Sequence, residues 1–146
     1  MNPDIYIIGA GAIGKVLAVF LQRAGKQVVL VRGSIHNEPT IYSKIEVNLI
    51  GKNSISEEIK LVTLDKLHEM NGIIVLTNKS FGNAALAGKL KLITKNSPLV
   101  LLQNGLGVEE PFMNEGFKAV YRCVLFATSQ PTSENVYRFQ DRKSVV

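Results

Sequence analysis

Three glycines between a short apolar run and a helical pattern constrain the fold of this 146-residue chain more than any other feature. Residues 4–9 (DIYIIG) form a short run rich in β-branched side chains, which is typical of a buried strand. Over residues 12–24 apolar side chains recur at helical spacing, and Gly25 follows at the position where helices commonly end. The pattern therefore predicts a strand that turns directly into a helix through a glycine-rich segment.

The residues of this turn match the pattern G-x-G-x-x-G; they are Gly9, Ala10, Gly11, Ala12, Ile13 and Gly14. In a strand-to-helix context Gly9 permits the tight turn, Gly11 lets a pyrophosphate approach the backbone, and Gly14 lets the helix pack closely on the strand. Free N–H groups at the helix start would face the anion. We predict that the segment binds the phosphates of a dinucleotide; a turn of the same shape without a ligand is the alternative.

An arginine ends the second apolar run, QVVLV, which covers residues 27–31. Domains that bind NAD tend to place an acidic residue here for the ribose hydroxyls, whereas the 2′-phosphate of NADP requires a cation. The guanidinium of Arg32 can hold a phosphate with paired charge-assisted hydrogen bonds. The sequence therefore predicts NADP as the cofactor, with a solvated arginine at a strand end as the alternative.

The rest of the chain alternates between extended and helical segments. Two extended segments, residues 41–51 and 55–62, flank a turn and are expected to pair as a hairpin or as edge strands. Further segments are expected in this order: a short helix over 64–70, a strand over 72–77, a helix over 80–95, a strand over 98–102, a short helix over 108–115, and extended runs over 119–127 and 135–140. This alternation predicts an α/β fold of the Rossmann type, a doubly wound and mostly parallel sheet with helices on both faces. No repeat or linker divides residues 1–146, so a single domain is expected.

Two polar side chains come directly after predicted strands. Lys79 follows the strand over 72–77, and Asn104 follows the strand over 98–102. Ligands of open α/β sheets bind beyond the carboxyl ends of the strands, so both side chains are expected in the crevice next to the glycine turn. There they could hold a nicotinamide ribose or a substrate oxygen. A surface lysine and an ordinary Asn-Gly turn are the alternatives.

Composition and charge narrow the functional class. Hydrophobic residues make up 46% and charged residues 20% of the chain, which indicates a globular protein. No run approaches about 18 consecutive apolar residues, so we expect no membrane association and a soluble, cytoplasmic protein. The net charge of +5 allows an anionic partner. The lysines of residues 89–95 lack interleaved aromatic side chains, so no nucleic-acid binding is expected.

Metal chemistry is not indicated by the sequence. His36 and His68 lack the paired spacing of a metal site, and the single cysteine, Cys123, cannot complete one. Cys123 lies in an apolar run and is expected to be a buried strand thiol.

The motifs IIGAGAIG, the arginine after the second strand, the lysine after VLT and the segment QNGLG resemble, in this order and at similar intervals, those of the ketopantoate reductase family. The resemblance covers essentially the whole chain. It implies the NADPH-dependent reduction of 2-dehydropantoate (ketopantoate) to pantoate in pantothenate biosynthesis, with a small keto acid as substrate.

The resemblance also assigns roles to individual residues. The glycine turn, Gly9 through Gly14, would bind the cofactor phosphates, and Arg32 matches the strand-end arginine of the family. Asn104 matches an asparagine that contacts cofactor and substrate, and Lys79 matches the lysine after the fourth main strand. These two are the candidate catalytic residues, because they would position substrate and nicotinamide. Ala127 falls near a cofactor contact of the family.

The chain departs from the family pattern at two points. Many members carry a glutamine three positions after the lysine, where this chain has Gly82. Members also carry a second, helical domain that supplies a lysine general acid, and we expect that domain to be absent from this chain. The chain alone is therefore expected to bind NADP but to reduce ketopantoate poorly or not at all.

Other classes stay open at the level of sequence. The chain could be the cofactor domain of another NADP-dependent 2-keto or 3-hydroxy acid dehydrogenase, or a non-enzymatic NADP-binding module. A domain that lacks its partner exposes apolar surface, which leaves self-association as a homodimer open.

Overall fold

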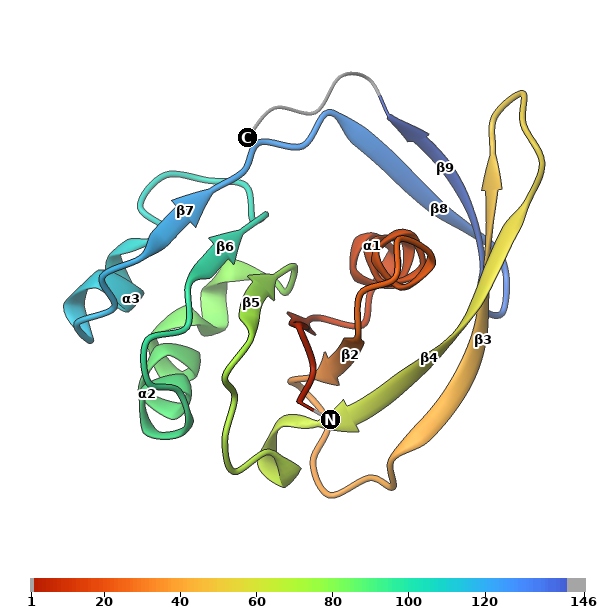
Figure 1. The fold of residues 1–146 in the computed structure, drawn as a ribbon. Coiled ribbons are helices and arrows are strands. Elements are labelled where there is room, and N and C mark those ends of the chain that lie inside the picture. Colours follow the sequence, from red (N-terminus) through yellow and green to blue (C-terminus); the bar gives the residue numbers. More distant parts are fainter. Residues whose placement is uncertain (1, 142–146) are drawn as a thin grey trace.

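Residues 2–141 are described by a computed structural model, which shows a single curved sheet with helices on both faces (Figure 1). Nine strands form the sheet in the order β7-β6-β5-β1-β2-β4-β3-β9-β8. Their bounds are β1 Ile5–Ile8, β2 Val28–Arg32, β3 Ile41–Leu49, β4 Ile55–Thr63, β5 Ile73–Leu76, β6 Leu99–Leu101, β7 Val120–Arg122, β8 Ala127–Ser133 and β9 Val136–Asp141. The helices are α1 Ala12–Arg23, α2 Asn83–Ile93 and α3 Glu110–Asn114, with short 3-10 turns η1 Leu64–Lys66 and η2 Ser80–Gly82.

The strand order reverses on either side of β1. The chain runs from β1 to β2 in one direction, and it returns to place β5 on the opposite side of β1. Strands β7, β6, β5, β1, β2 and β4 all pair in parallel, so their carboxyl ends share one edge of the sheet. In doubly wound sheets such a reversal opens a crevice at that edge, and ligands bind there.

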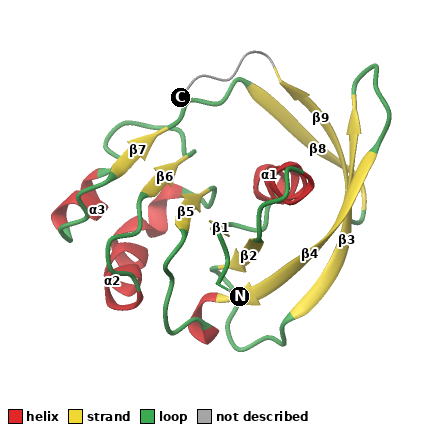
Figure 2. Ribbon diagram, viewed as in Figure 1, coloured by secondary structure: helices red, strands yellow, loops and turns green. Residues whose placement is uncertain are grey.

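The remaining strands extend the sheet and curl it around α1 (Figure 2). Strand β3 pairs antiparallel with β4, β9 pairs in parallel with β3, and β8 pairs antiparallel with β9. Helix α1 contacts β3, β4, β8 and β9, while α2 and α3 contact each other on the opposite face. The expected mostly parallel sheet with helices on both faces is therefore confirmed.

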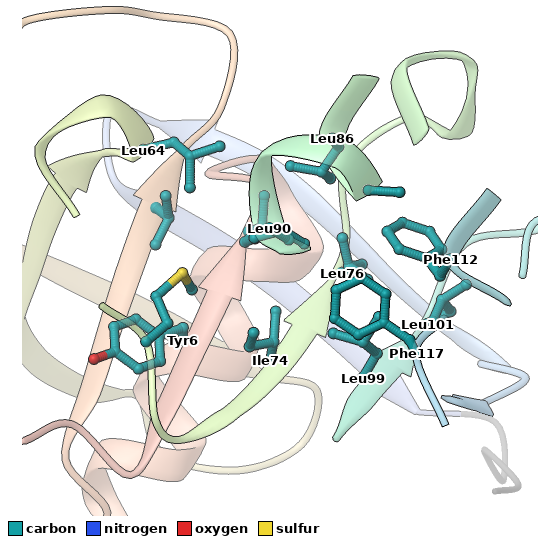
Figure 3. Close-up of a cluster of buried hydrophobic side chains, with 14 of the residues drawn as sticks. Tyr6, Leu64, Ile74, Leu76, Leu86, Leu90, Leu99, Leu101, Phe112 and Phe117 are labelled. Atoms are coloured by element: carbon teal, nitrogen blue, oxygen red, sulfur yellow. The ribbon is translucent and has the colours of Figure 1, made fainter. Parts of the chain in front are cut away.

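Two apolar clusters hold the layers together. Figure 3 shows the first, in which Leu86 and Leu90 of α2 and Phe112 of α3 pack on Ile74, Leu76 and other sheet residues. The second lies between the other face and α1, around Val16 and Val19. Strand β1 is buried along its whole length because its side chains alternate between the two clusters. That position explains the continuous apolar run in the sequence.

Several expected elements differ in the structure. The hairpin of β3 and β4 forms, but it is not an edge, because both strands have a second neighbour. Only Leu64–Lys66 of the expected helix over 64–70 is helical, as a 3-10 turn. The expected strand over 119–127 is split: β7 ends at Arg122 and β8 begins at Ala127. Cys123 therefore lies outside any strand and is half-buried, and this burial raises the pKa of its thiol.

A substitution at Gly14 tests how tightly α1 packs on the end of β1. A Cβ on Gly14 would lie 1.9 Å from the carbonyl oxygen of Gly9 and 2.8 Å from the hydroxyl of Thr77. We expect Gly14→Ala to lower the free energy of unfolding by about 3 kcal/mol or more, since backbone has to move. Urea denaturation followed by circular dichroism measures the change.

Gly88, in the middle of α2, is the matched control. A Cβ there meets only the carboxylate of Glu115 at 3.9 Å, so Gly88→Ala is expected to raise stability by up to about 1 kcal/mol through helix propensity. Unfolding of Gly14→Ala at the same urea concentration as the unaltered chain would contradict the close packing.

Candidate functional site

The carboxyl ends of β1 and β5 are joined by one hydroxyl. Thr77 follows β5, and its Oγ1 donates toward the carbonyl oxygens of Ile8 at 3.1 Å and Gly9 at 3.0 Å. Gly9 has a φ of +115°, a left-handed conformation that favours glycine, and a Cβ there would lie 2.5 Å from the same hydroxyl. The residue that follows β5 therefore holds the turn between β1 and α1 in place.

The start of α1 is open where a phosphate would approach. A Cβ on Gly11 would meet no atom within 4 Å, in contrast to Gly9 and Gly14. Gly11 is the N-cap residue of α1, and no side chain accepts a hydrogen bond from the first turn. The free N–H groups of this turn and the positive end of the helix dipole favour an anion. Gly9, Ala10 and Gly11 line a cavity of about 920 Å³.

Arg32 lines the same cavity at the end of β2. Its Nη2 donates to the carbonyl oxygen of Pro39 at 3.1 Å. Its Nε is buried and has no hydrogen-bond partner among the described residues. A buried N–H without an acceptor costs free energy, so this donor matches an anionic ligand at the end of β2.

Polar contacts hold the loop that follows Arg32. The backbone N–H of Asn37 donates to Asp65 Oδ2 at 3.0 Å and to Oδ1 at 3.3 Å. The Thr63 side chain and this N–H hold the pKa of Asp65 below its usual value. Because the folded-state pKa is lowered, the stabilisation is present above the usual aspartate pKa and is lost as the pH falls through the folded one.

A second cavity, of about 350 Å³, lies at the ends of β5 and β6. Ile13, Asn104 and Ala127 line it, and both cavities share Thr77, Asn78 and Lys79. The two cavities therefore lie next to each other, the larger one lined by Arg32 and the glycine turn and the smaller one by Asn104. A dinucleotide needs an elongated site, with its pyrophosphate near the middle.

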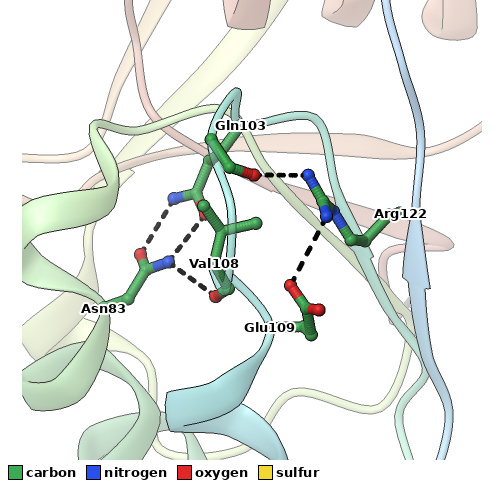
Figure 4. A network of polar contacts seen from close by, with 6 residues as sticks. Asn83, Gln103, Val108, Glu109 and Arg122 are labelled. Atoms are coloured by element: carbon green, nitrogen blue, oxygen red, sulfur yellow. Dashed lines mark hydrogen bonds and ion pairs between the residues drawn. The ribbon is translucent and has the colours of Figure 1, made fainter.

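Figure 4 shows a network of side-chain amides, of which Gln103 lines the second cavity. Asn83 and Gln103 form a reciprocal pair: Asn83 Nδ2 donates to Gln103 Oε1 at 2.7 Å, and Gln103 Nε2 donates to Asn83 Oδ1 at 2.9 Å. Gln103 Nε2 also lies 2.9 Å from the carbonyl oxygen of Asn78, and Asn83 donates to the carbonyl of Val108 at 3.1 Å. The network joins the loops after β5 and β6, and thereby sets the positions of Lys79 and Asn104.

Arg122 also holds the loop after Asn104 in place. Arg122 Nη2 donates to the carbonyl oxygen of Gly105 at 2.6 Å, and Nη1 lies 3.7 Å from Glu109 Oε2. Gly105 has a φ of +119°, so the turn requires glycine. The Asn-Gly pair is therefore a turn as well as part of the cavity wall.

Most of the sequence-predicted site residues are brought together. Gly9, Ala10, Gly11, Arg32 and Lys79 line the larger cavity, and Ile13, Lys79, Asn104 and Ala127 line the smaller one. Ala12 and Gly14 line neither cavity: the Ala12 carbonyl accepts a hydrogen bond from Ser129 at 3.3 Å, and Gly14 packs against Gly9. Their predicted role in binding stays a prediction, and their structural role is helix packing.

Three residues that line the cavities were not predicted from the sequence: Thr77, Gln103 and Lys15. Gln103 directly follows the strand expected over 98–102, so the rule that singled out Asn104 would have found it one residue earlier. Thr77 falls inside the strand expected over 72–77, and only the end of β5 at Leu76 shows that it follows a strand. Lys15 lies within a helix, and nothing in its sequence surroundings indicates a cavity residue.

Within residues 2–141 no group of three or more His, Cys, Asp or Glu side chains is placed to hold a metal ion. No helix in the same range is long and apolar enough to cross a membrane.

The reversal of strand order, the glycine turn and the crevice above it define a Rossmann-type domain, the class of protein that binds dinucleotides at this edge of its sheet. The family model described as ketopantoate reductase PanE/ApbA matches residues 5–146. The chain belongs to the ketopantoate reductase family, as the resemblance of its motifs indicated.

Individual relatives agree with this assignment. The chain is 29% identical over 116 residues to 2-dehydropantoate 2-reductase of Pyrococcus abyssi, and the match covers 80% of this chain but 38% of that protein. A dimeric ketopantoate reductase from Staphylococcus aureus superposes with a TM-score of 0.67 at 20% identity, over 92% of this chain and 43% of that one. A D-mandelate dehydrogenase solved with NADH and anilino(oxo)acetate gives a TM-score of 0.73 at 20% identity, over 93% and 45%. The two structures show the fold, and the chain spans less than half of each relative.

The amide network is tested by Asn83→Asp. The new carboxylate would face two carbonyl oxygens, Gln103 Oε1 and that of Val108, in place of the NH₂ that now donates to both. We expect a loss of about 2 to 4 kcal/mol in the free energy of unfolding at neutral pH. Burial raises the pKa of such a carboxyl, so the loss should shrink as the pH falls and the group becomes protonated.

The control is Asn53→Asp, at an exposed position in the turn between β3 and β4, which makes the same change of charge outside the network. Chemical denaturation at two pH values measures both variants. Equal losses in the two variants would contradict a structural role for the amide pair.

Proposed function

We propose that this chain is the cofactor-binding part of an NADPH-dependent reductase that converts 2-dehydropantoate to pantoate. The observation that carries the proposal is Arg32, which ends β2 and lines the cavity beside the open glycine turn, and whose buried Nε has no partner among the described residues. An anion at the end of β2 in a Rossmann-type domain corresponds to the 2′-phosphate of NADP. Membership of the ketopantoate reductase family supports the reaction and the substrate.

The residues of the two cavities suit the parts of NADP in order. Arg32 would hold the 2′-phosphate, and the backbone N–H groups after Gly11 would hold the pyrophosphate. Lys79 and Asn104 would place the nicotinamide ribose and the keto acid, with Ala127 as a backbone contact beside them. When bound, the cofactor supplies a hydride for the keto carbon.

The residues of this chain can orient the reactants, and the proton for the new hydroxyl requires a further group. Lys79 is exposed at the end of β5 and can hold an oxygen of the substrate as a point charge. The resemblance implies that the general acid is a lysine of a second, helical domain. The match to only 38% of the Pyrococcus abyssi protein supports the proposal that residues 1–146 form one domain of a larger protein.

A second candidate is the cofactor domain of another 2-keto acid dehydrogenase. The D-mandelate dehydrogenase superposes as well as a ketopantoate reductase does, and its structure contains NADH. Gly82, at the position where many ketopantoate reductases carry glutamine, lines the larger cavity without a side chain. Substrate choice by the complete protein separates the two candidates. A non-enzymatic NADP-binding module is a third candidate.

The cytoplasmic location expected from the sequence stays a prediction. The Staphylococcus aureus relative is described as dimeric, which supports a homodimer here as well. Phe81 and Leu106 are more than nine-tenths exposed, so apolar surface is present for such a contact.

Calorimetric titration of the chain with NADPH and, separately, with NADH tests cofactor choice. A charge-assisted phosphate contact is worth about 1.5 to 3 kcal/mol, so NADPH should bind about ten- to a hundredfold more tightly. Arg32→Ala should remove most of this difference and leave NADH binding nearly unchanged. Arg138→Ala, which removes an exposed arginine of β9, is the control and should change neither affinity. If the chain binds neither NADPH nor NADH, the reductase proposal loses its main support.

A turnover assay tests whether this chain only binds the cofactor or also catalyses the complete reaction. The chain of 146 residues should oxidise NADPH with ketopantoate at a rate near background, because its described residues do not supply the proposed proton donor. A longer protein that includes the second domain should reduce ketopantoate in preference to benzoylformate. Turnover by the short chain at the rate of the longer protein would refute the division of roles.

A further inference from the structure

Lys15 is a further cation on the wall of the larger cavity, besides Arg32 and Lys79, and the family resemblance gives it no role. Lys15 is half-buried, one turn into α1, and lines the cavity together with Arg32. Its Nζ donates to Asn135 Oδ1 at 3.0 Å and lies 5.6 Å from the centroid of the Tyr137 ring. The two contacts hold the ammonium group at one place on the cavity wall.

The turn that holds Lys15 is itself fixed. Asn135 lies in the turn between β8 and β9 with a φ of 55°, and its carbonyl oxygen accepts from the backbone N–H of Glu46 at 2.9 Å. Strand β8 is tied to the start of α1 through the hydroxyl of Ser129. Figure 1 shows β8 and β9 lying alongside α1. The hairpin of β8 and β9 therefore forms part of the cavity wall.

The strand order shows which end of a dinucleotide Lys15 would meet. From β1 toward β9 the sheet passes through β2, β4 and β3, so the Tyr137 and Asn135 contacts direct Lys15 toward the side on which Arg32 ends β2. Lys79 and Asn104 follow β5 and β6, on the opposite side of β1. Lys15 thus lies on the adenosine side of the glycine turn.

We propose that Lys15, held by Asn135, is a second cation for the 2′-phosphate of the nucleotide and determines cofactor specificity together with Arg32. The inference rests on the proposed function. An ammonium group has three N–H donors, so Lys15 can keep its bond to Asn135 while it donates to a phosphate. The backbone N–H groups at the start of α1 serve the pyrophosphate, which leaves the lysine for the terminal phosphate of the ribose.

Charge in the cavity supports an anion of more than one negative charge. The described residues that line it include four cationic side chains, Lys15, Arg32, Lys79 and Lys89, and one carboxylate, Glu134. Excess positive charge in a concave site raises the local concentration of an anionic ligand.

The experiment compares adenosine 2′,5′-bisphosphate with 5′-AMP, and NADPH with NADH, by calorimetry on the 146-residue chain. Lys15→Met removes the charge, Lys15→Gln removes it but keeps a donor for Asn135, and Lys15→Arg keeps a cation. Lys52→Met, in the exposed turn between β3 and β4, is the control with the same change of net charge. Thermal unfolding of each variant checks that it is folded.

We expect Lys15→Met and Lys15→Gln to weaken the two 2′-phosphorylated ligands about five- to tenfold, and to leave 5′-AMP and NADH within about twofold. Lys15→Arg should retain most of the preference, and Lys52→Met should change nothing. An equal loss for NADPH and NADH would overturn the proposal, because Lys15 would then serve the pyrophosphate; unchanged affinities would overturn it as well. If the unaltered chain binds none of the four ligands, the proposed function itself fails, which is a different result.

Discussion

The hydroxyl of Thr77 joins the two strands between which the site is built. By donating toward the carbonyl oxygens of Ile8 and Gly9 it ties the end of β5 to the end of β1. The same hydroxyl excludes a Cβ at Gly9 and Gly14, so the turn and the first turn of α1 are packed against β5 as one unit. The positions of the helix N–H groups, and of the residues that follow Thr77, depend on this contact. A flexible turn at this point would not hold these groups in fixed positions.

Glycines of the same motif have opposite physical roles. Gly14 is required because atoms are already present where its side chain would be, whereas Gly11 faces empty space. The lack of a side chain at Gly14 allows close packing, and the lack of one at Gly11 leaves room for a ligand. Only the space at Gly11 bears directly on function, and a match to the motif does not distinguish these two roles of glycine.

The curled half of the sheet gives this domain a wall that a flat doubly wound sheet would lack. Strands β3, β4, β8 and β9 wrap around α1, and the turn between β8 and β9 reaches the cavity. On the other half, the Asn83–Gln103 pair keeps the loops after β5 and β6 in a fixed relation. The two cavities are thus supported by different parts of the structure, the larger by the β8–β9 hairpin and the smaller by a buried amide pair.

The sequence by itself determined the local elements and the glycine turn. Apolar periodicity and glycine spacing are local properties, so β1, α1 and β2 could be placed, together with Arg32, Lys79 and Asn104 at strand ends. The pairing of β3 with β4 was predicted as a hairpin, but pairing between distant strands was not predicted, because no local pattern states that β9 pairs with β3 or that β3 and β4 lie inside the sheet. The extent of β7 and β8 also depended on such neighbours, since the apolar run over 119–127 reads as one strand until its pairing is known. The tertiary structure alone decided that Lys15 contacts Asn135, 120 residues later, because hydrogen bonds between distant segments form only when the sheet has curled.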